Sequence, residues 1–348
     1  MHTGSNAEPN LDILRALAVL MVLADHVAEM VAIQNPGLSF HPYDLILGRL
    51  GVLLFFVHTA LVLNCSMERT RLSGWNDIRS FYIRRIFRIY PLAIATVVLV
   101  VALQVPAMPW REYQVDFASI LTSLTLTGNL LYTAPVQVPM WSLPIEMQMY
   151  LALPLIYLAV RGRPLWVLAL WLLSLPLAWL QPTYLGRFNV IAFAPCFLGG
   201  VLAFSLAQRS QFKLPGWTWL PALLLIGAAY VLLQSRMQNI HFPPVQWLTC
   251  LLVGAIIPSF SDSTSQALNT ASAFVAKYSY GIYLFHIPAI WLGCVVLSEA
   301  SAWLQWTIAA VTLCVLTGAG FHLIESPAIK LGARLATRRP AVLQPAMN

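Results

Sequence analysis

The sequence has few charged residues for its length. Only 9% of its 348 residues are Asp, Glu, Lys or Arg, whereas 59% are hydrophobic and the mean hydropathy is +0.73. A soluble globular chain carries roughly 25% charged residues, because its surface faces water. This chain cannot cover an ordinary water-facing surface, so we expect lipid to be its main solvent.

Metal-binding and nucleic-acid-binding patterns are also missing. None of the five cysteines lies in a C-x-x-C or Cys/His spacing, and each sits in or beside an apolar stretch, where it packs as a small hydrophobe. We therefore predict no metal site and no disulfide framework. The net charge of +7 comes from basic residues in short loops between apolar runs, which argues against nucleic acid as a partner.

Most of the sequence consists of long apolar runs. A spanning helix needs roughly 20 mostly apolar residues, and ten runs qualify, at 11–33, 45–66, 87–106, 143–160, 164–181, 189–207, 217–234, 244–260, 279–298 and 303–324. The Thr- and Ser-rich segment 117–133 is expected to be an interfacial or re-entrant helix. We predict an all-α, polytopic transmembrane bundle of about ten helices in residues 1–335, with a short tail at 336–348.

The distribution of basic residues predicts the orientation. With a cytoplasmic N-terminus, only Arg111, Arg187 and Arg236 fall outside, and Arg15 and Arg49 lie within helices. The other fifteen of the twenty Lys and Arg residues fall on the cytoplasmic side. This bias fits the positive-inside rule with both termini cytoplasmic. We expect a multi-pass protein of the bacterial inner membrane.

Arg15 and His26 are ionisable residues within the first apolar run. They are eleven residues apart, so on a helix their directions differ by only about 20° and their heights by roughly 16 Å. An ionisable residue at such depth usually faces a cavity or a partner. The alternative is structural: His26 packs against Glu29, and Arg15 extends its head group toward the interface.

Three arginines, Arg84, Arg85 and Arg88, are predicted at the start of the third span. Such a cluster is commonly a positive-inside anchor. Arg85 and Arg88, three residues apart, also suit bidentate contacts to phosphate at a helix mouth. Both interpretations stay open at this point.

Two later spans carry further polar residues. Glu146 and Tyr150 share a helical face, and a glutamate just inside a span can orient a histidine, hold an acceptor hydroxyl or pair with an arginine. Tyr283 and His286 are three residues apart, and His286 is a secondary candidate. Glu325, before Ser-Pro, is interpreted as a helix-terminating and charge-pairing residue.

Together these motifs resemble the membrane-bound acyltransferase family 3, whose members acylate sugars and other envelope or secreted molecules. In chain order, the matching elements are Arg15-x10-His26, the RxxR of Arg85 and Arg88, Trp141-Ser-Leu with Glu146 and Tyr150, and Tyr280-Gly-Ile-Tyr-Leu-Phe-His286. One element departs from the family pattern. His58 and Thr59 stand where the family has Ser-Gly in Phe-Phe-x-x-Ser-Gly.

The resemblance implies an acyl-CoA donor, acetyl-CoA by family preference, supplied from the cytoplasm. It implies as acceptor a hydroxyl of an envelope or secreted glycan on the periplasmic side. Arg84, Arg85 and Arg88 would hold the CoA phosphates, with Arg15 lining the route to His26. No fused SGNH-type hydrolase domain is expected, so we expect transfer either to finish within the membrane domain or to be passed to a separate periplasmic partner.

His26 would act as general base on the acceptor hydroxyl, or form a covalent acyl-histidine. Glu146 or Glu29 would fix its tautomer, and Tyr150 would position the thioester carbonyl. The residues predicted to contact substrate are Glu29, His58, Tyr283 and His286.

The rival hypothesis from another class is a transporter of lipid-linked sugars or acylated metabolites, although no inverted repeat is visible. A non-catalytic scaffold would leave the burial of Arg15 and His26 unexplained.

Overall fold

The computed structural model describes residues 8–35, 37, 46–184, 186, 188–209, 213–237 and 242–337. In these ranges the chain is nearly all helical, and its only β contact is an isolated bridge between Leu214 and Phe260. The predicted all-α class is confirmed. The predicted tail lies outside the described residues from residue 338 onward.

The elements follow one another in a single series of helices. In chain order they are α1 (Pro9–Gln34), α2 (Ile46–Arg69), α3 (Trp75–Ala102), α4 (Phe117–Thr125), α5 (Gly128–Leu131), η1 (Val138–Trp141), α6 (Ser142–Val160), α7 (Pro164–Tyr184), α8 (Asn189–Ala207), η2 (Gly216–Thr218), α9 (Trp219–Ser235), α10 (Pro243–Ile256), η3 (Ile257–Ser259), α11 (Gln266–Ile290), η4 (Trp291–Val296), α12 (Ala302–Ala319), η5 (Gly320–Glu325) and α13 (Ser326–Thr337).

Nine segments of the described chain are long and apolar enough to cross a membrane, and the shorter apolar helix Pro243–Ser259 makes a tenth candidate. Each of these ten overlaps one of the ten runs predicted from the sequence. A bilayer offers no partner for backbone N–H and C=O groups, so each apolar run closes its own hydrogen bonds as a helix. The chain is therefore a multi-pass membrane protein. Residues 117–133 form α4 and α5, both too short to span.

Three predicted helix boundaries were wrong. Helix α11 begins at Gln266 rather than near residue 279, and the last helical segment continues to Thr337 rather than ending near residue 324. Helix α3 begins at Trp75, where the Asp77 carboxylate accepts a hydrogen bond from the Gly74 N–H (3.3 Å), rather than near residue 87. Arg85 and Arg88 therefore lie inside the helix and not at its start. A search for apolar runs overlooks such polar first turns, because they carry no hydrophobic signal.

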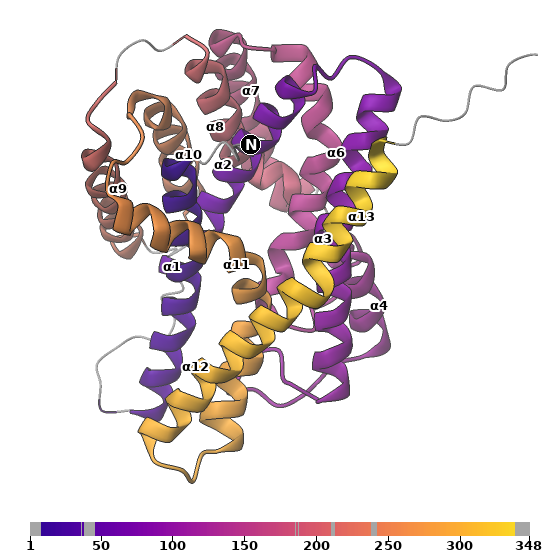
Figure 1. Cartoon of the computed structure of the whole chain (residues 1–348), viewed down its shortest axis with the longest axis vertical. Helices are drawn as coiled ribbons and strands as arrows, with labels where there is room; N and C mark the ends of the chain where they lie inside the picture. Colours follow the sequence, from indigo (N-terminus) through magenta and orange to yellow (C-terminus); the bar gives the residue numbers. More distant parts are fainter. Residues whose placement is uncertain are drawn as a thin grey trace, which may run out of the picture.

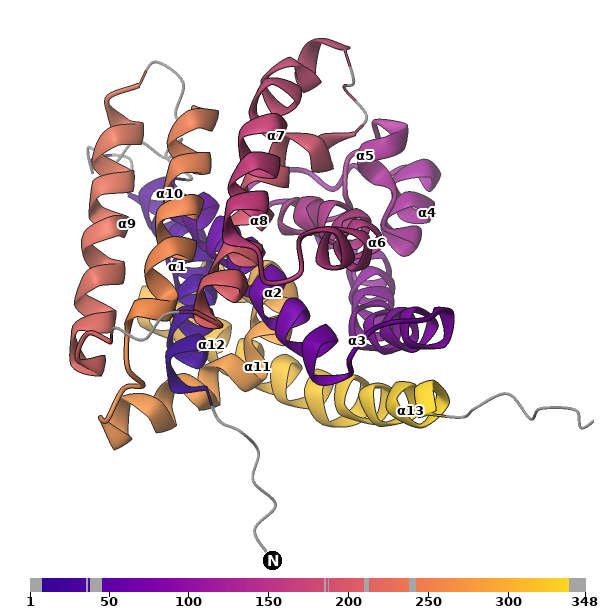
Figure 2. The ribbon, with the colours of Figure 1, turned by 90° about the horizontal axis from the view of Figure 1, so that it is seen from above.

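Helix α2 has the most buried span of the described helices, and α1 and α8 pack against it (Figures 1 and 2). Two glycines allow this close approach. A Cβ at Gly51 would overlap the carbonyl oxygen of Ala18 in α1, and one at Gly200 would overlap that of Val57. Small residues let helix backbones approach closely in membranes. The packing directs the polar residues of α1 and α2 toward the interior of the bundle.

Helices α12 and α13 are joined through the π-helical segment η5 into one long element that runs past α11 and α3 (Figure 1). Its far end is attached to α3, where the Ser80 hydroxyl donates to the carbonyl oxygen of Ala336 (2.8 Å). A π-helical turn re-aims the side chains that follow it. Here it carries Glu325 to the interior face of α3.

Candidate active site

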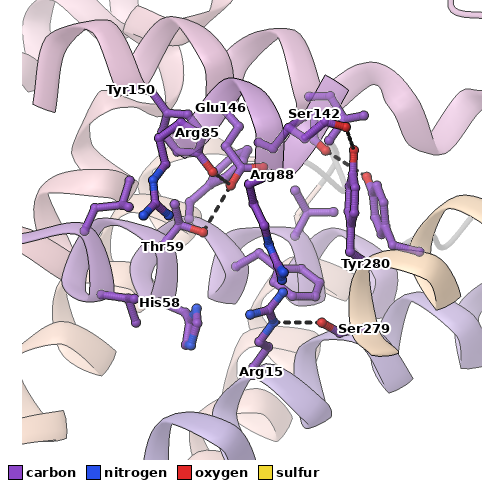
Figure 3. A pocket seen from close by; sticks show the side chains of 18 residues that line it. Arg15, His58, Thr59, Arg85, Arg88, Ser142, Glu146, Tyr150, Ser279 and Tyr280 are labelled. Atoms are coloured by element: carbon purple, nitrogen blue, oxygen red, sulfur yellow. Dashed lines mark hydrogen bonds between the residues drawn. The ribbon is translucent and has the colours of Figure 1, made fainter. Parts of the chain in front are cut away.

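The larger of two neighbouring polar cavities lies among α1, α2, α3, α6 and α11, and we call it the arginine cavity (Figure 3). Its empty volume, including the part open to solvent, is about 800 Å³. It brings together seven of the residues predicted for the site, which are Arg15, His58, Arg85, Arg88, Glu146, Tyr150 and Tyr283. Arg84 is not among its lining residues.

Arg15 points into the arginine cavity rather than toward the membrane surface. Its Nε donates to the Ser279 hydroxyl (2.7 Å), which in turn donates to the carbonyl oxygen of Ala276 (2.8 Å). The guanidinium also lies close enough to that of Arg88 for the two charges to repel each other (Figure 3). The alternative in which Arg15 extends away to the interface does not describe this structure.

Arg88 is paired with Glu325 at 2.7 Å, and the glutamate is only 1% exposed. The charge-pairing role predicted for Glu325 is therefore confirmed, with Arg88 as its partner. The predicted helix end at this residue is wrong, because the chain continues directly from η5 into α13. A buried carboxylate without a cation would be costly, so this pair holds η5 against α3. It also offsets part of the charge of Arg88.

Arg85 has no such partner. It makes no hydrogen bond or ion pair within the described part of the chain, and its Nε is buried without an acceptor. Its guanidinium lies 5.7 Å from the ring centre of Phe81, and Figure 3 shows it beside Tyr150. With three arginines and one glutamate along its wall, the cavity carries a positive excess that suits an anion.

Glu146 is held by two hydroxyl groups. Tyr150 donates to its Oε1, and the Thr59 hydroxyl donates to the same oxygen at 3.2 Å (Figure 3). The dipeptide His58–Thr59, which departs from the family pattern, thus lines the cavity, and its threonine supports the carboxylate. No signal in the sequence connects Thr59 to Glu146, because their contact depends on how α2 packs against α6.

The second cavity, which we call the histidine cavity, has an empty volume of about 430 Å³ including its open part. It is lined by Val22, Asp25, His26, Gly48, Arg49, Val52, Val138, Pro139, Trp141 and Tyr283. Val52 and Tyr283 line both cavities. The Tyr283 hydroxyl lies 2.8 Å from that of Ser142 and donates to the carbonyl oxygen of Pro139, so its ring is fixed in the shared wall.

His26 shows features of both interpretations. Its Nδ1 contacts the Glu29 carboxylate at 3.4 Å, as the structural alternative predicts, yet its ring also lines the histidine cavity. Glu29 rather than Glu146 is therefore the carboxylate beside the imidazole. His26 stacks on His286 with ring centres 5.0 Å apart.

The His286 ring is oriented by the backbone. Its Nδ1 lies 3.1 Å from the carbonyl oxygen of Ile282, which can only accept, so Nδ1 carries the proton. Its Nε2 has no hydrogen-bond partner in the part of the chain that the structure describes. The imidazole contributes a buried acceptor beside His26, although it lines neither cavity.

Sequence reasoning missed Arg49 and Asp25, which line the histidine cavity with His26. Arg49 was counted only as a basic residue within a helix. Its signal was available, because an arginine inside an apolar span is by default a candidate for function. Ser142 stands in the Trp141-Ser-Leu motif but was assigned no role, and Ser279 had no comparable signal, since serines are common in membrane helices.

Comparison with known proteins identifies the family of this chain. The family model described as "Acyltransferase domain", acyltransferase family 3, matches residues 8–321. The chain is 27% identical to Acyltransferase MdmB of Streptomyces mycarofaciens, covering 97% of this chain and 95% of that protein. It is 24% identical to Nodulation protein 10 of Rhizobium leguminosarum bv. viciae, covering 97% and 98%. No solved structure matches it. The chain belongs to acyltransferase family 3 and is a membrane acyltransferase.

Proposed function

We propose that this enzyme moves an acyl group, acetyl in the first instance, from acyl-CoA supplied in the cytoplasm to a hydroxyl of an envelope or secreted glycan. The observation that carries the proposal is the pair of adjoining cavities, one rich in arginine and the other lined by a histidine. They correspond in chemistry to a polyanionic donor and a hydroxyl acceptor. The membrane in this proposal is the bacterial inner membrane.

The donor would occupy the arginine cavity. Arg85 offers guanidinium N–H groups that no acceptor among the described residues uses, so it is the leading contact for a CoA phosphate. Arg15 and Arg88 add positive charge along the same wall. Arg84 lies outside the lining and would contribute only at the approach to it. With the N-terminus cytoplasmic, as the charge distribution predicts, this is the inner end of the path.

The acyl group must then reach His26. Along α1, His26 lies roughly 16 Å beyond Arg15, on the same helical face. A pantetheine arm is an extended chain that spans much of such a distance while its phosphates stay among the arginines. It would pass Tyr283, the residue fixed in the wall between the cavities.

The proposed chemistry is general-base acyl transfer. With Nδ1 of His26 engaged by Glu29, Nε2 is available to take the proton of the acceptor hydroxyl. The acceptor oxygen attacks the thioester carbonyl, the C–S bond breaks, and the CoA thiolate regains a proton from the imidazolium. In the acyl-histidine alternative, the imidazole attacks first and the acceptor removes the acyl group in a second step. Glu146 and Tyr150 would face the donor rather than His26.

The test uses the full chain purified in detergent. Acetyl-CoA is expected to raise its melting temperature, and radiolabelled acetyl-CoA with an envelope glycan extract is expected to yield labelled glycan and free CoA. The control is Arg163→Gln, an exposed arginine remote from both cavities. Absence of both effects in the wild type would refute the donor assignment. Transport of intact acetyl-CoA without release of CoA would favour the transporter.

A further inference from the structure

Arg49 is a partly buried arginine of the histidine cavity that the proposed mechanism does not use. Its guanidinium carbon lies 4.5 Å from the ring centre of Trp141 and 5.1 Å from that of Phe193. Its Nε is buried without an acceptor, and the described part of the chain gives it neither a hydrogen bond nor an ion pair. It stands on α2, about two and a half turns before the His58–Thr59 pair.

Placing a guanidinium without an ion-pair partner inside a membrane costs free energy. Charged side chains within a span almost always pair or face a water-filled cavity. The two aromatic rings stabilise the cation through their faces, but they cannot accept from the N–H groups in its plane. The rings hold the guanidinium in place, and its donor edge has no partner among the described residues. That edge is the part that binds an anion bidentately.

The other polar residues of the cavity do not supply the missing acceptor. Asp25 lines the same cavity, but it is not within ion-pair distance of Arg49. Tyr283 directs its hydroxyl to Ser142 and Pro139. A ligand that enters beside His26 therefore meets a fixed guanidinium whose donors are unused.

We propose that Arg49 binds an anionic group, a carboxylate or a phosphate, on the acceptor, so that the enzyme acylates an acidic sugar. This inference rests on the proposed function, because it takes the histidine cavity to be the acceptor side. The anion belongs to the acceptor rather than to CoA, since the histidine cavity is distinct from the arginine cavity and shares only Val52 and Tyr283 with its lining. The guanidinium would hold the sugar while His26 receives the hydroxyl proton.

The experiment measures melting temperatures of the purified full chain with glucuronate, glucose 6-phosphate and neutral glucose at matched ionic strength. At least one anionic sugar is expected to stabilise the wild type more than glucose does, and the better one identifies carboxylate or phosphate. Arg49→Gln is expected to weaken the apparent Kd for that sugar about 10- to 100-fold. Arg163→Gln and Arg85→Gln are expected to leave it unchanged.

The donor response is read in parallel. Stabilisation by CoA is expected to persist in Arg49→Gln and to be lost in Arg85→Gln. If Arg49→Gln does not fold, Arg49→Lys keeps the charge without the planar donor edge, and it is expected to show a weakened preference for the anionic sugar. Because the sugar measurements contain no CoA, they report on Arg49 even if the donor assignment fails.

Three outcomes would overturn the inference. The first is equal stabilisation by the neutral and both anionic sugars. The second is an anionic preference that survives in Arg49→Gln. The third is loss of CoA stabilisation in Arg49→Gln, which would assign the guanidinium to the donor.

Discussion

Arg15 and His26 share one face of helix α1 and yet line different cavities. The wall between the cavities contains Tyr283 from α11, whose hydroxyl is bound to Ser142 and to the carbonyl of Pro139. The two residues therefore do not form one catalytic pair. They line two cavities. We predict that acyl transfer between these cavities depends on Tyr283.

Removing the ring of Tyr283 is expected to open the wall between the two cavities. In Tyr283→Ala the cavities join, so water reaches the thioester and the ratio of acetyl-CoA hydrolysis to glycan acylation should rise several-fold. The matched control is Tyr280→Phe, a hydrogen-bonded tyrosine of the same helix that lines only the arginine cavity. Radiolabelled acetate and glycan are measured together, and an unchanged ratio would show that Tyr283 is not a barrier.

The two stacked histidines are expected to differ in importance. His26→Gln should lower acyl transfer by about 100- to 10,000-fold, the range for loss of a general base. His286→Gln should have a smaller effect, because His286 lines neither cavity and its Nδ1 is committed to the backbone. Initial rates with purified variants decide the matter. A larger loss of acyl transfer in His286→Gln than in His26→Gln would assign the role of general base to His286.

Substitution of Arg85 is expected to affect CoA binding, whereas substitution of Arg88 is expected to affect the stability of the protein. Arg85→Met is expected to abolish stabilisation by CoA with little change in the melting temperature of the unliganded protein. Arg88→Met leaves the buried Glu325 without its cation, so it should cost about 2 kcal/mol, less than for a fully buried pair because part of Arg88 is exposed. Adding Glu325→Gln should recover much of that loss. Equal melting behaviour of both single variants would contradict this division.

The Thr59–Glu146 hydrogen bond provides a test of the departure from the family pattern. Thr59→Val removes one of the two hydroxyl donors to the carboxylate and is expected to cost about 1 kcal/mol and to slow transfer several-fold. Thr96→Val is the control, because Thr96 is buried but donates only to the Leu92 carbonyl of its own helix. Thermal melts and initial rates check both effects. Equal rates for the two variants would leave Thr59 without a role in the site.

The close contact of α1 and α2 should tolerate no added side chain. In Gly51→Leu the new atoms meet the Ala18 carbonyl and Val22, and the helices must move apart at a cost of about 1–3 kcal/mol or more. Because α1 carries both Arg15 and His26, activity should fall with stability. Gly318→Ala, where a Cβ meets nothing within 4 Å, is expected to be neutral or stabilising. A stable, active Gly51→Leu protein would contradict the observed packing.

The sequence alone determined the helices and the family. A bilayer requires about 20 apolar residues for each span and full internal hydrogen bonding, so composition and length predict the spans directly. The motifs from Arg15 to His286 identified the family because their order and spacing are visible along the chain. The shared face of Arg15 and His26 followed from helical periodicity.

Tertiary structure decided how these residues are grouped. The separation of Arg15 from His26 by Tyr283, the pairing of Arg88 with Glu325, and the contact of Thr59 with Glu146 all join residues on different helices. Arg49 acquired its position from Trp141 and Phe193, which belong to two further segments. Periodicity fixes directions around one helix axis only. Which faces meet depends on close approach at residues such as Gly51 and Gly200, and no local pattern encodes that outcome.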